Sequence, residues 1–453
     1  MVFLDSTTYT EISYKMNILL PRKSTDNHAF TIVELLIVIV VIGILATITI
    51  VAYNGLRTKA VTSSLQSDLE QNQKIIQIYA AQNNDQFPTG QSDAVANGLK
   101  SSSNILSYRW ITGNNYCMIA TNSSSSTAYY VTNTMTTPAI GTCPVVINTF
   151  VGSSSGSGYV NASGTNARFN GVNGIAFDAS GNLFISDFNN NSIRKSTPSG
   201  VVTTAAGSGI QGSANGTSAT AQFNYPTGLA FDSVGNLYIA DSNNNSIRKM
   251  TPDGTVTTFA GTGVAGYADG SGASSQFKSP NGIVVDSYDN LYVADVGNSR
   301  IRKITSSGIV STFAGSGVAG SLDGTGTNAK ISPVGIGIDT SGNLYVSTFT
   351  PNIRKITPAA VVTTLIGPGP IVKGPQFIKV DASGTLYVTD VFSLSVYTVT
   401  QSGVATIIAG NGTQGFVNGL ATASSFSGPS GIAIDQSGVI FVADNLYIVT
   451  LLR

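Results

Sequence analysis

The stretch that decides the fold runs from residue 228 to residue 261 and reads GLAFDSVGNLYIADSNNNSIRKMTPDGTVTTFAG. A closely similar stretch precedes it at residues 174–207, and another follows at residues 282–315. Weaker copies begin at Gly335, Phe377 and Gly431. One aspartate recurs in every copy, at intervals of 54, 54, 53, 42 and 54 residues: Asp178, Asp232, Asp286, Asp339, Asp381 and Asp435. Self-similarity at such a period is typical of repeat architectures.

Each copy predicts four short β-strands. In the copy that begins at Gly228, we expect them over residues 228–231, 237–240, 247–250 and 256–260, between turns rich in Gly, Asn, Asp and Pro. Four strands in a repeat of this length are typical of a propeller blade. The copies resemble NHL repeats. Over residues 145–453 this resemblance implies an all-β, six-bladed β-propeller.

The two ends of the repeat region are expected to share one blade. The last copy reaches Arg453 after its third predicted strand, residues 446–452. Residues 145–151, which precede the first full copy, have the pattern of a fourth strand. We therefore expect this N-terminal strand to complete the last blade, close the ring and leave no free sheet edge.

An apolar run near the N-terminus covers residues 30–52. At a rise of about 1.5 Å per residue, a helix of this length crosses a hydrocarbon core of about 30 Å. Glu34 stands inside the run, where a carboxylate is costly unless it has a partner. Basic residues before the run favour an N-terminus in the cytoplasm, whereas Arg57 and Lys59 after it weaken that bias.

Residues 29–36, AFTIVELL, resemble the prepilin peptidase site of type IV pilins. The resemblance implies cleavage between Ala29 and Phe30, methylation of the new Phe30 amino group, and pairing of Glu34 with the amino terminus of a neighbouring subunit. Ala29 departs from the Gly that is usual there, which puts the efficiency of processing in doubt. Residues 1–29 make a long leader, which a start at Met16 would shorten to a more usual length. A plain membrane anchor and a conventional signal peptide are the alternatives.

A long helix over residues 30–84, with its transmembrane half at 30–52, is expected to lead into a small α+β head at 85–144. The outer half of the helix carries an apolar stripe at spacings of four and seven. In the head, residues 116–121 and 128–132 read as strands. Cys117 and Cys143 predict one disulfide in an exported chain, and two buried free thiols are the alternative.

The composition limits the chemistry. The chain has 23 basic and 23 acidic residues, only 10% of all residues are charged, and nucleic acid is therefore not an expected partner. From residue 144 onward there is no His, Glu or Cys. We predict no enzyme activity, no catalytic residues, no metal and no cofactor. A metal-dependent lactonase or lyase is an alternative, in which the Asp-Gly pairs at Asp269 and Asp323 could contribute to a Ca²⁺ site of oxygen ligands.

An aspartate and an arginine seven residues apart recur across the predicted second turn of the first three copies. We expect them to pair within each blade, because a contact repeated in every blade serves the fold more often than a ligand. The pairs are Asp187 with Arg194, Asp241 with Arg248, and Asp295 with Arg302.

Together these features predict a pilus-like surface protein, most simply a minor or tip pilin whose propeller binds a protein or a glycan. It would span the membrane once, with the N-terminus in the cytoplasm, before assembly at the cell surface. Prepilin peptidase and other pilin subunits are the expected partners. A type II secretion pseudopilin is the alternative, because both classes share the N-terminal motif. The long loops after each fourth strand are the expected binding face.

Overall fold

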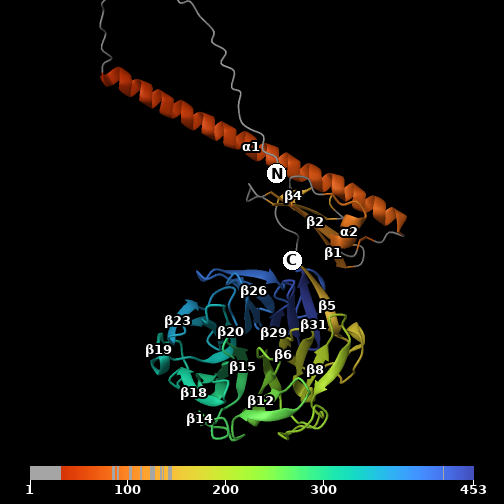
Figure 1. Cartoon of the computed structure of the whole chain (residues 1–453), viewed down its shortest axis with the longest axis vertical. Helices are drawn as coiled ribbons and strands as arrows, with labels where there is room; N and C mark the ends of the chain where they lie inside the picture. The colour runs from red at the N-terminus through yellow and green to blue at the C-terminus, as the bar shows by residue number, and fades with distance from the viewer. Residues whose placement is uncertain are drawn as a thin grey trace, which may run out of the picture. The chain divides into compact units, whose positions relative to one another are not determined.

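The structure is a computed structural model that describes residues 32–83, 87–88, 91–100, 105–112, 115–122, 128–132, 135, 137–140, 145–421 and 423–452. The chain divides between Ser64 and Leu65 into two compact units. The first holds the beginning of a long helix. The second holds the rest of that helix, a small sheet and a ring-like array of further sheets (Figure 1).

The long helix, α1 (Ile32–Gln82), has 51 residues. It is the one helix, within the described residues, that is long and apolar enough to cross a membrane. Its apolar side chains from Ile39 to Leu56 are exposed. The hydroxyls of Thr47 and Thr49 donate to the carbonyls of Gly43 and Leu45, four residues earlier, at 2.7 and 2.8 Å. Hydroxyls bonded in this way do not require water, so they suit an apolar surrounding.

The second half of α1 packs onto the small head. Its apolar stripe is buried at Leu65, Leu69 and Ile76. The Gln73 side-chain amide donates to the carbonyls of Thr132 and Met135 at 3.2 and 2.7 Å. The head contains α2 (Gln91–Ala96) and an antiparallel sheet in the order β1-β2-β3-β4, with β1 (Ile105–Thr112), β2 (Asn115–Thr121), β3 (Ala128–Thr132) and β4 (Ala139–Ile140).

Six further antiparallel sheets follow among the described residues; each has four main strands, which in the first five sheets are consecutive in the chain. The first two are β6 (Val172–Phe177), β7 (Leu183–Asp187), β8 (Ser192–Ser196), β9 (Val202–Ala206), and β10 (Pro226–Phe231), β11 (Leu237–Asp241), β12 (Ser246–Met250), β13 (Val256–Ala260). The third and fourth are β15 (Pro280–Val285), β16 (Leu291–Asp295), β17 (Arg300–Ile304), β18 (Ile309–Ala314), and β20 (Pro333–Ile338), β21 (Leu344–Thr348), β22 (Ile353–Ile356), β23 (Val361–Ile366).

The fifth sheet is β24 (Pro375–Val380), β25 (Leu386–Asp390), β26 (Ser395–Val399), β27 (Ala405–Ala409). The sixth combines both ends of the repeat region: β29 (Pro429–Ile434), β30 (Ile440–Asp444), β31 (Tyr447–Leu452) and, from the N-terminal side, β5 (Val146–Gly152). Two-residue strands extend the third, fourth and sixth sheets at their outer edges: β14 (Gly270–Ser271), β19 (Gly324–Thr325) and β28 (Gly419–Leu420).

The first strands of the six sheets lie innermost (Figure 1). They contact one another in the order β6, β10, β15, β20, β24, β29, and β29 contacts β6 again. Within the sixth sheet, β5 runs antiparallel to β31, with Val146 opposite Leu452 and Gly152 opposite Tyr447. Strands 306 residues apart in the chain are therefore neighbours in one sheet.

The recurring aspartate of each copy forms the turn between the first and second strands. In the third sheet, Asp286 Oδ1 accepts the backbone N–H groups of Tyr288 and Asn290, both at 2.9 Å. A side chain that binds its own following backbone stabilises a tight turn locally. This local role in the turn accounts for the return of the residue in all six copies.

Glycines allow the inner strands to approach closely. A Cβ atom at Gly335 would lie 2.0 Å from the carbonyl oxygen of Gln376 in the next sheet. The corresponding positions in four other sheets are also glycine, and each is similarly close to its neighbour: Gly174, Gly228, Gly282 and Gly431. The fifth sheet alone has a larger residue there, Phe377.

Candidate functional site

The predicted processing and assembly residues lie at the N-terminal end. Ala29 and Phe30 fall outside the described residues. Glu34 belongs to α1, but its side chain is also outside the described part. The apolar surface that follows is exposed along the helix, so lipid or neighbouring helices must cover it. The predicted roles of these three residues stay predictions.

The predicted disulfide involves one described cysteine. Cys117 is buried in β2 and packs with Val146 of β5, beside Ile119 and Tyr130. Cys143 lies outside the described residues. The Cys117–Cys143 disulfide therefore stays a prediction.

The structure brings together all three predicted aspartate–arginine pairs. Arg194 Nη1 lies 2.8 Å from Asp187 Oδ2, and the equivalent distances are 2.9 Å for Arg248 with Asp241 and for Arg302 with Asp295. Each aspartate ends the second strand of its sheet and each arginine stands in the third. All six side chains are fully buried.

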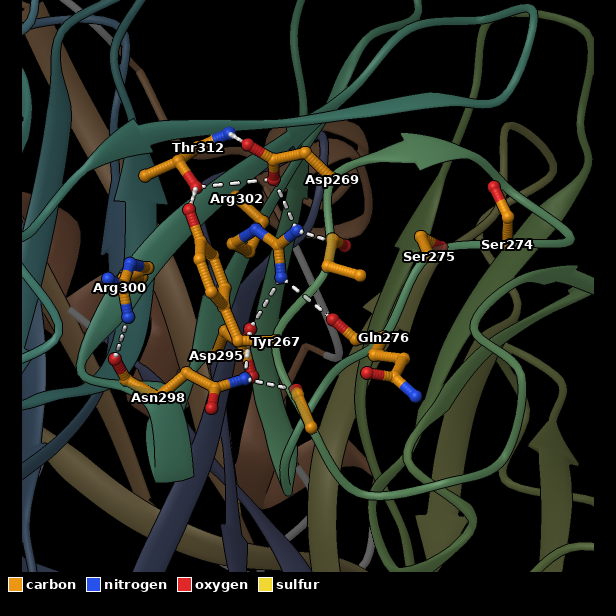
Figure 2. Close-up of polar contacts among 12 residues, drawn as sticks. Tyr267, Asp269, Ser274, Ser275, Gln276, Asp295, Asn298, Arg300, Arg302 and Thr312 are labelled. Carbon is orange, nitrogen blue, oxygen red and sulfur yellow. Dashed lines mark hydrogen bonds and ion pairs between the residues drawn. The ribbon is translucent and has the colours of Figure 1, made fainter.

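The arginine of the third sheet is bound on two sides (Figure 2). Besides Asp295, Arg302 Nη1 donates to the carbonyl of Gln276 at 2.9 Å. Its Nη2 donates to the carbonyl of Ala268 at 2.8 Å and to Asp269 Oδ1 at 2.5 Å. Gln276, Ala268 and Asp269 all belong to the long loop that enters the sheet. Arg302 therefore fastens that loop, residues 261–279, to the sheet.

The loop residue of this network was not recognised as an arginine partner from the sequence. Asn161 and Asn215 hold Arg194 and Arg248 as Asp269 holds Arg302, with Nη2–Oδ1 distances of 2.6 and 2.9 Å. In these three cases the loop residue precedes its arginine by 33 residues. That constant separation could have revealed the contact. Asp323 similarly accepts from Arg354 Nη2, at 2.6 Å.

These contacts bear on the Ca²⁺ alternative. The Asp269 carboxylate accepts from Arg302 and Thr312, and the Asp323 carboxylate from Arg354 and Thr364. Burial raises the pKa of the Asp187, Asp241 and Asp295 carboxyls, and hydrogen bonds from Asn side chains, backbone N–H groups and the arginines oppose that shift. Over the described ranges, no group of three or more His, Cys, Asp or Glu side chains is placed to hold a metal.

The last three sheets depart from this arrangement. In the fourth, Thr348 stands at the end of β21 where the earlier sheets have aspartate. In the fifth, Tyr397 replaces the arginine, and Asp390 instead accepts the backbone N–H groups of Lys373 and Gly374, both at 2.9 Å. In the sixth, Asp444 accepts the hydroxyl of Tyr447 at 2.6 Å.

The innermost strands of all six sheets line a cavity of about 320 Å³, here called the central cavity. Its lining side chains are glycine or apolar with one exception, Lys379 of β24. That side chain is reached by solvent although protein surrounds it. Desolvation by these surroundings lowers the pKa of the Lys379 amine. No motif in the sequence marks Lys379 as a candidate site residue.

Exposed apolar side chains mark the loops after the fourth strands. Ile210, Val264 and Val318 occupy equivalent positions in three of these loops, and Val264 is 62% exposed. Turns after second strands share this side because neighbouring strands are antiparallel, and they expose Phe349 and Phe392. We call these five residues the loop-face patch. Exposed apolar groups of this kind often mark interaction surfaces.

Comparison with known families finds two matches in the chain. Residues 25–50 match the prokaryotic N-terminal methylation motif. Residues 110–314 match the SMP-30/gluconolactonase/LRE-like region.

Two relatives align with the repeats. The chloroplastic protein SUPPRESSOR OF QUENCHING 1 of Arabidopsis thaliana is 28% identical over 306 residues, which are 60% of this chain and 29% of that protein. NHL repeat-containing protein 2 of Bos taurus is 37% identical over 95 residues, which are 20% of this chain and 13% of that protein. The chain thus spans less than a third of the length of either relative.

A solved structure shares the fold. A structural genomics protein of unknown function from Bacteroides thetaiotaomicron superposes with a TM-score of 0.53 at 16% identity, over 74% of this chain and 84% of that one. The chain therefore combines two recognisable parts. It carries a type IV pilin-like N-terminal methylation motif, followed by a propeller domain of the SMP-30/gluconolactonase and NHL-repeat type. The motif implies, in general terms, processing by prepilin peptidase and assembly with pilin subunits.

Proposed function

We propose that this protein is a minor or tip subunit of a type IV pilus-like assembly, and that its propeller is a binding module for a surface protein or a glycan. The methylation motif at residues 25–50, joined to an exposed apolar helix, is the observation that carries the pilus assignment. A propeller of about 300 residues would crowd a shaft if every subunit carried one, which favours a minor or tip position. A type II secretion pseudopilin is the second candidate, since the same motif serves both.

We propose further that the six sheets are the blades of one closed propeller, with β5 as its closing strand. The pairing of β5 with β31 and the contact of β29 with β6 support this arrangement. Closure would remove the free edges that otherwise invite aggregation. It would also hold both ends of the repeat region within one blade.

For the binding role, the loop-face patch is the supporting feature. Aliphatic side chains at equivalent positions and two exposed aromatic rings can cover apolar protein surface or stack on sugar rings. A lactonase or lyase activity, as in the gluconolactonase-like family, is a less favoured alternative. The central cavity lining has one lysine and no carboxylate to bind a metal.

The pilus assignment is tested by shearing surface appendages from producing cells and determining the N-terminus of this protein by mass spectrometry. We expect a mature chain that begins at N-methylated Phe30 and is enriched in the sheared material. Glu34→Gln should leave cleavage intact and deplete the protein from that fraction, because the charge that pairs with the neighbouring amino terminus is gone. An uncut chain confined to the membrane would leave a membrane-anchored propeller and remove the pilus assignment.

The binding role has its own test. Sheared material carrying Val264→Asp should bind less to a printed glycan array and to whole bacterial cells than the unmodified protein. Val234→Asp is the matched control, because Val234 is also exposed but lies in a turn after a first strand, on the opposite side. Equal loss from both variants, or no binding by the unmodified protein, would argue against an adhesive loop face.

A further inference from the structure

Lys379 interrupts a ring of small, uncharged residues. It stands opposite Tyr387 in the ladder between β24 and β25. The matching ladder position in the other sheets is held by small apolar residues or glycine: Ala176, Ala230, Val284, Gly337 and Ala433. One of six equivalent positions therefore places a positive charge toward the axis of the inner strands. Repetition of the fold does not require this lysine.

The charge has no counter-ion in its surroundings. The residues that line the central cavity come from β6, β10, β15, β20, β24 and β29, and none of them except Lys379 is titratable. Over the described ranges, the Lys379 ammonium has neither a salt bridge nor a side-chain hydrogen bond. The other cavity walls are formed by Ile, Leu, Val, Ala, Phe and Gly. Solvent reaches the Lys379 ammonium, and a positive charge in a cavity without a carboxylate attracts a small anion.

The fifth sheet differs at the neighbouring position as well. Phe377, also in the cavity lining, replaces the glycine that the other five sheets have at the equivalent position. The cavity is thus asymmetric, with an aromatic ring and an ammonium group two residues apart on one strand. Its volume of about 320 Å³ lies at the lower end of the range of small-molecule pockets, about 300–1,000 Å³.

We propose that the central cavity binds a small monocarboxylate, whose carboxylate pairs with the Lys379 ammonium and whose remainder lies against the inner strands. Because Lys379 is the one charged side chain in the cavity lining, a ligand with one negative charge matches it. This site is separate from the loop-face patch and goes beyond the proposed adhesive role, so either can fail without the other.

The lowered pKa of Lys379 gives the binding a defined pH dependence. Desolvation favours the neutral amine, and a bound carboxylate would favour the ammonium form. Affinity should therefore fall as the pH rises through the lowered pKa of Lys379. The carboxylate of the ligand remains ionised throughout this window, so the lysine alone accounts for the change.

Octanoate is a suitable probe, with octanol as its neutral match. The full chain is reconstituted in lipid nanodiscs and exposed to formaldehyde and cyanoborohydride, and methylation of each lysine is measured by peptide mass spectrometry. We expect octanoate to slow methylation of Lys379 at least tenfold and to leave Lys355, on the third strand of the fourth sheet, unchanged. Equal protection by octanol would overturn the charge pairing, and no protection by octanoate would overturn the site.

Equilibrium dialysis of labelled octanoate provides a second readout, with empty nanodiscs subtracted. Lys379→Met should weaken binding at least tenfold, whereas Lys355→Met should leave it unchanged. If Lys379→Met does not fold, the methylation measurement on the unmodified chain still decides. Unchanged affinity in a folded Lys379→Met protein would contradict the proposal. Filament incorporation of the same variants separates this outcome from failure of the pilus assignment.

Discussion

The third and fifth sheets share their strand order but differ in how they hold the loop that enters them. In the third sheet, the buried Arg302 joins Asp295 to a long entering loop at residues 261–279. In the fifth, the connection over residues 367–374 is short, Tyr397 takes the place of the arginine, and backbone N–H groups satisfy Asp390. In the fifth sheet, the arginine is absent and the entering connection is short; the sixth sheet also lacks the arginine, although its entering loop is long. The repeated pair serves the architecture of the sheet.

On the inner strand, it is the fifth sheet that carries the unusual residues. The third sheet has Gly282 and Val284 on its inner strand, whereas the fifth has Phe377 and Lys379 at the same positions, both in the lining of the central cavity. Features that recur in most sheets, such as the glycines and the turn aspartates, are explained by close packing and by turns. Of the two features that occur once, Phe377 packs against the neighbouring core, whereas Lys379 has no packing or turn role of this kind. The difference teaches that a ligand site is better sought among the exceptions.

The largest expected effect comes from breaking the third sheet's network. Arg302→Met leaves the buried Asp295 carboxylate without its cation, and such a loss costs about 3–5 kcal/mol. A shift of the denaturant midpoint of the full chain measures it. Arg300→Met is the control, because Arg300 is half-buried and stacks over Tyr267 at 3.8 Å, a contact worth about 1 kcal/mol. Similar losses from both variants would contradict a structural role for the buried pair.

A smaller loss is expected from Gly335→Ala. The added Cβ would meet the carbonyl oxygen of Gln376 at 2.0 Å, so the fourth and fifth inner strands would have to separate. Overpacking of this kind costs about 1–3 kcal/mol. Gly367→Ala is the matched control, since nothing lies within 4 Å of its added Cβ. Thermal unfolding of the two variants side by side checks the difference, and equal stabilities would mean that the strands are less closely packed.

In the fifth sheet a gain is expected from Tyr397→Phe. The Tyr397 hydroxyl is buried and, among the described residues, has no hydrogen-bond partner. Burial also raises its pKa, with the nearby Asp390 charge acting in the same direction. Removing an unsatisfied buried hydroxyl should stabilise the chain by about 1 kcal/mol. A loss of stability in the denaturant titration would reveal a partner for that hydroxyl.

The smallest effect concerns Lys379, and its sign depends on pH. Because the folded pKa is lowered, the unfolded chain binds more protons between that value and 10.5, and stability rises with pH across this window. Lys379→Met should therefore stabilise the chain at pH 7. Its advantage should shrink as the pH approaches 10.5, where both states of the unmodified chain carry a neutral amine. Melting temperatures at several pH values measure this, and a constant difference would exclude protonation as the cause.

Much of the local structure followed from periodicity and turn residues. The strands expected over 237–240, 247–250 and 256–260 agree with β11, β12 and β13 to within one residue at each end. The expected strands at 116–121 and 128–132 agree equally well with β2 and β3. These segments are specified by neighbours in the chain, such as the alternation of apolar residues and the Asp and Gly of the turns. The pilin-like motif could likewise be recognised from the sequence because its residues are contiguous in the chain.

The candidate sites were less accessible to sequence reasoning. The spacing of seven residues suggested that Asp295 and Arg302 would meet, because both flank one turn. Asp269, 33 residues before Arg302, also accepts a hydrogen bond from it. That contact forms only because a long loop folds back over its own sheet. From the sequence alone the Asp269 carboxylate is therefore a candidate Ca²⁺ ligand, whereas in the structure it accepts hydrogen bonds from Arg302 and Thr312.

By itself the sequence determined the apolar N-terminal helix, the methylation motif, the repeat and the four strands of each copy, because each depends on residues close together in the chain. Only the tertiary structure decided which groups of different copies meet. It gathered the inner strands of the six sheets around one cavity, whereas the pairing of β5 with β31 was already expected from the sequence. It also left Lys379 without a counter-charge there. The surroundings of Lys379 are formed by six segments that lie far apart in the chain, so no local sequence pattern predicts them.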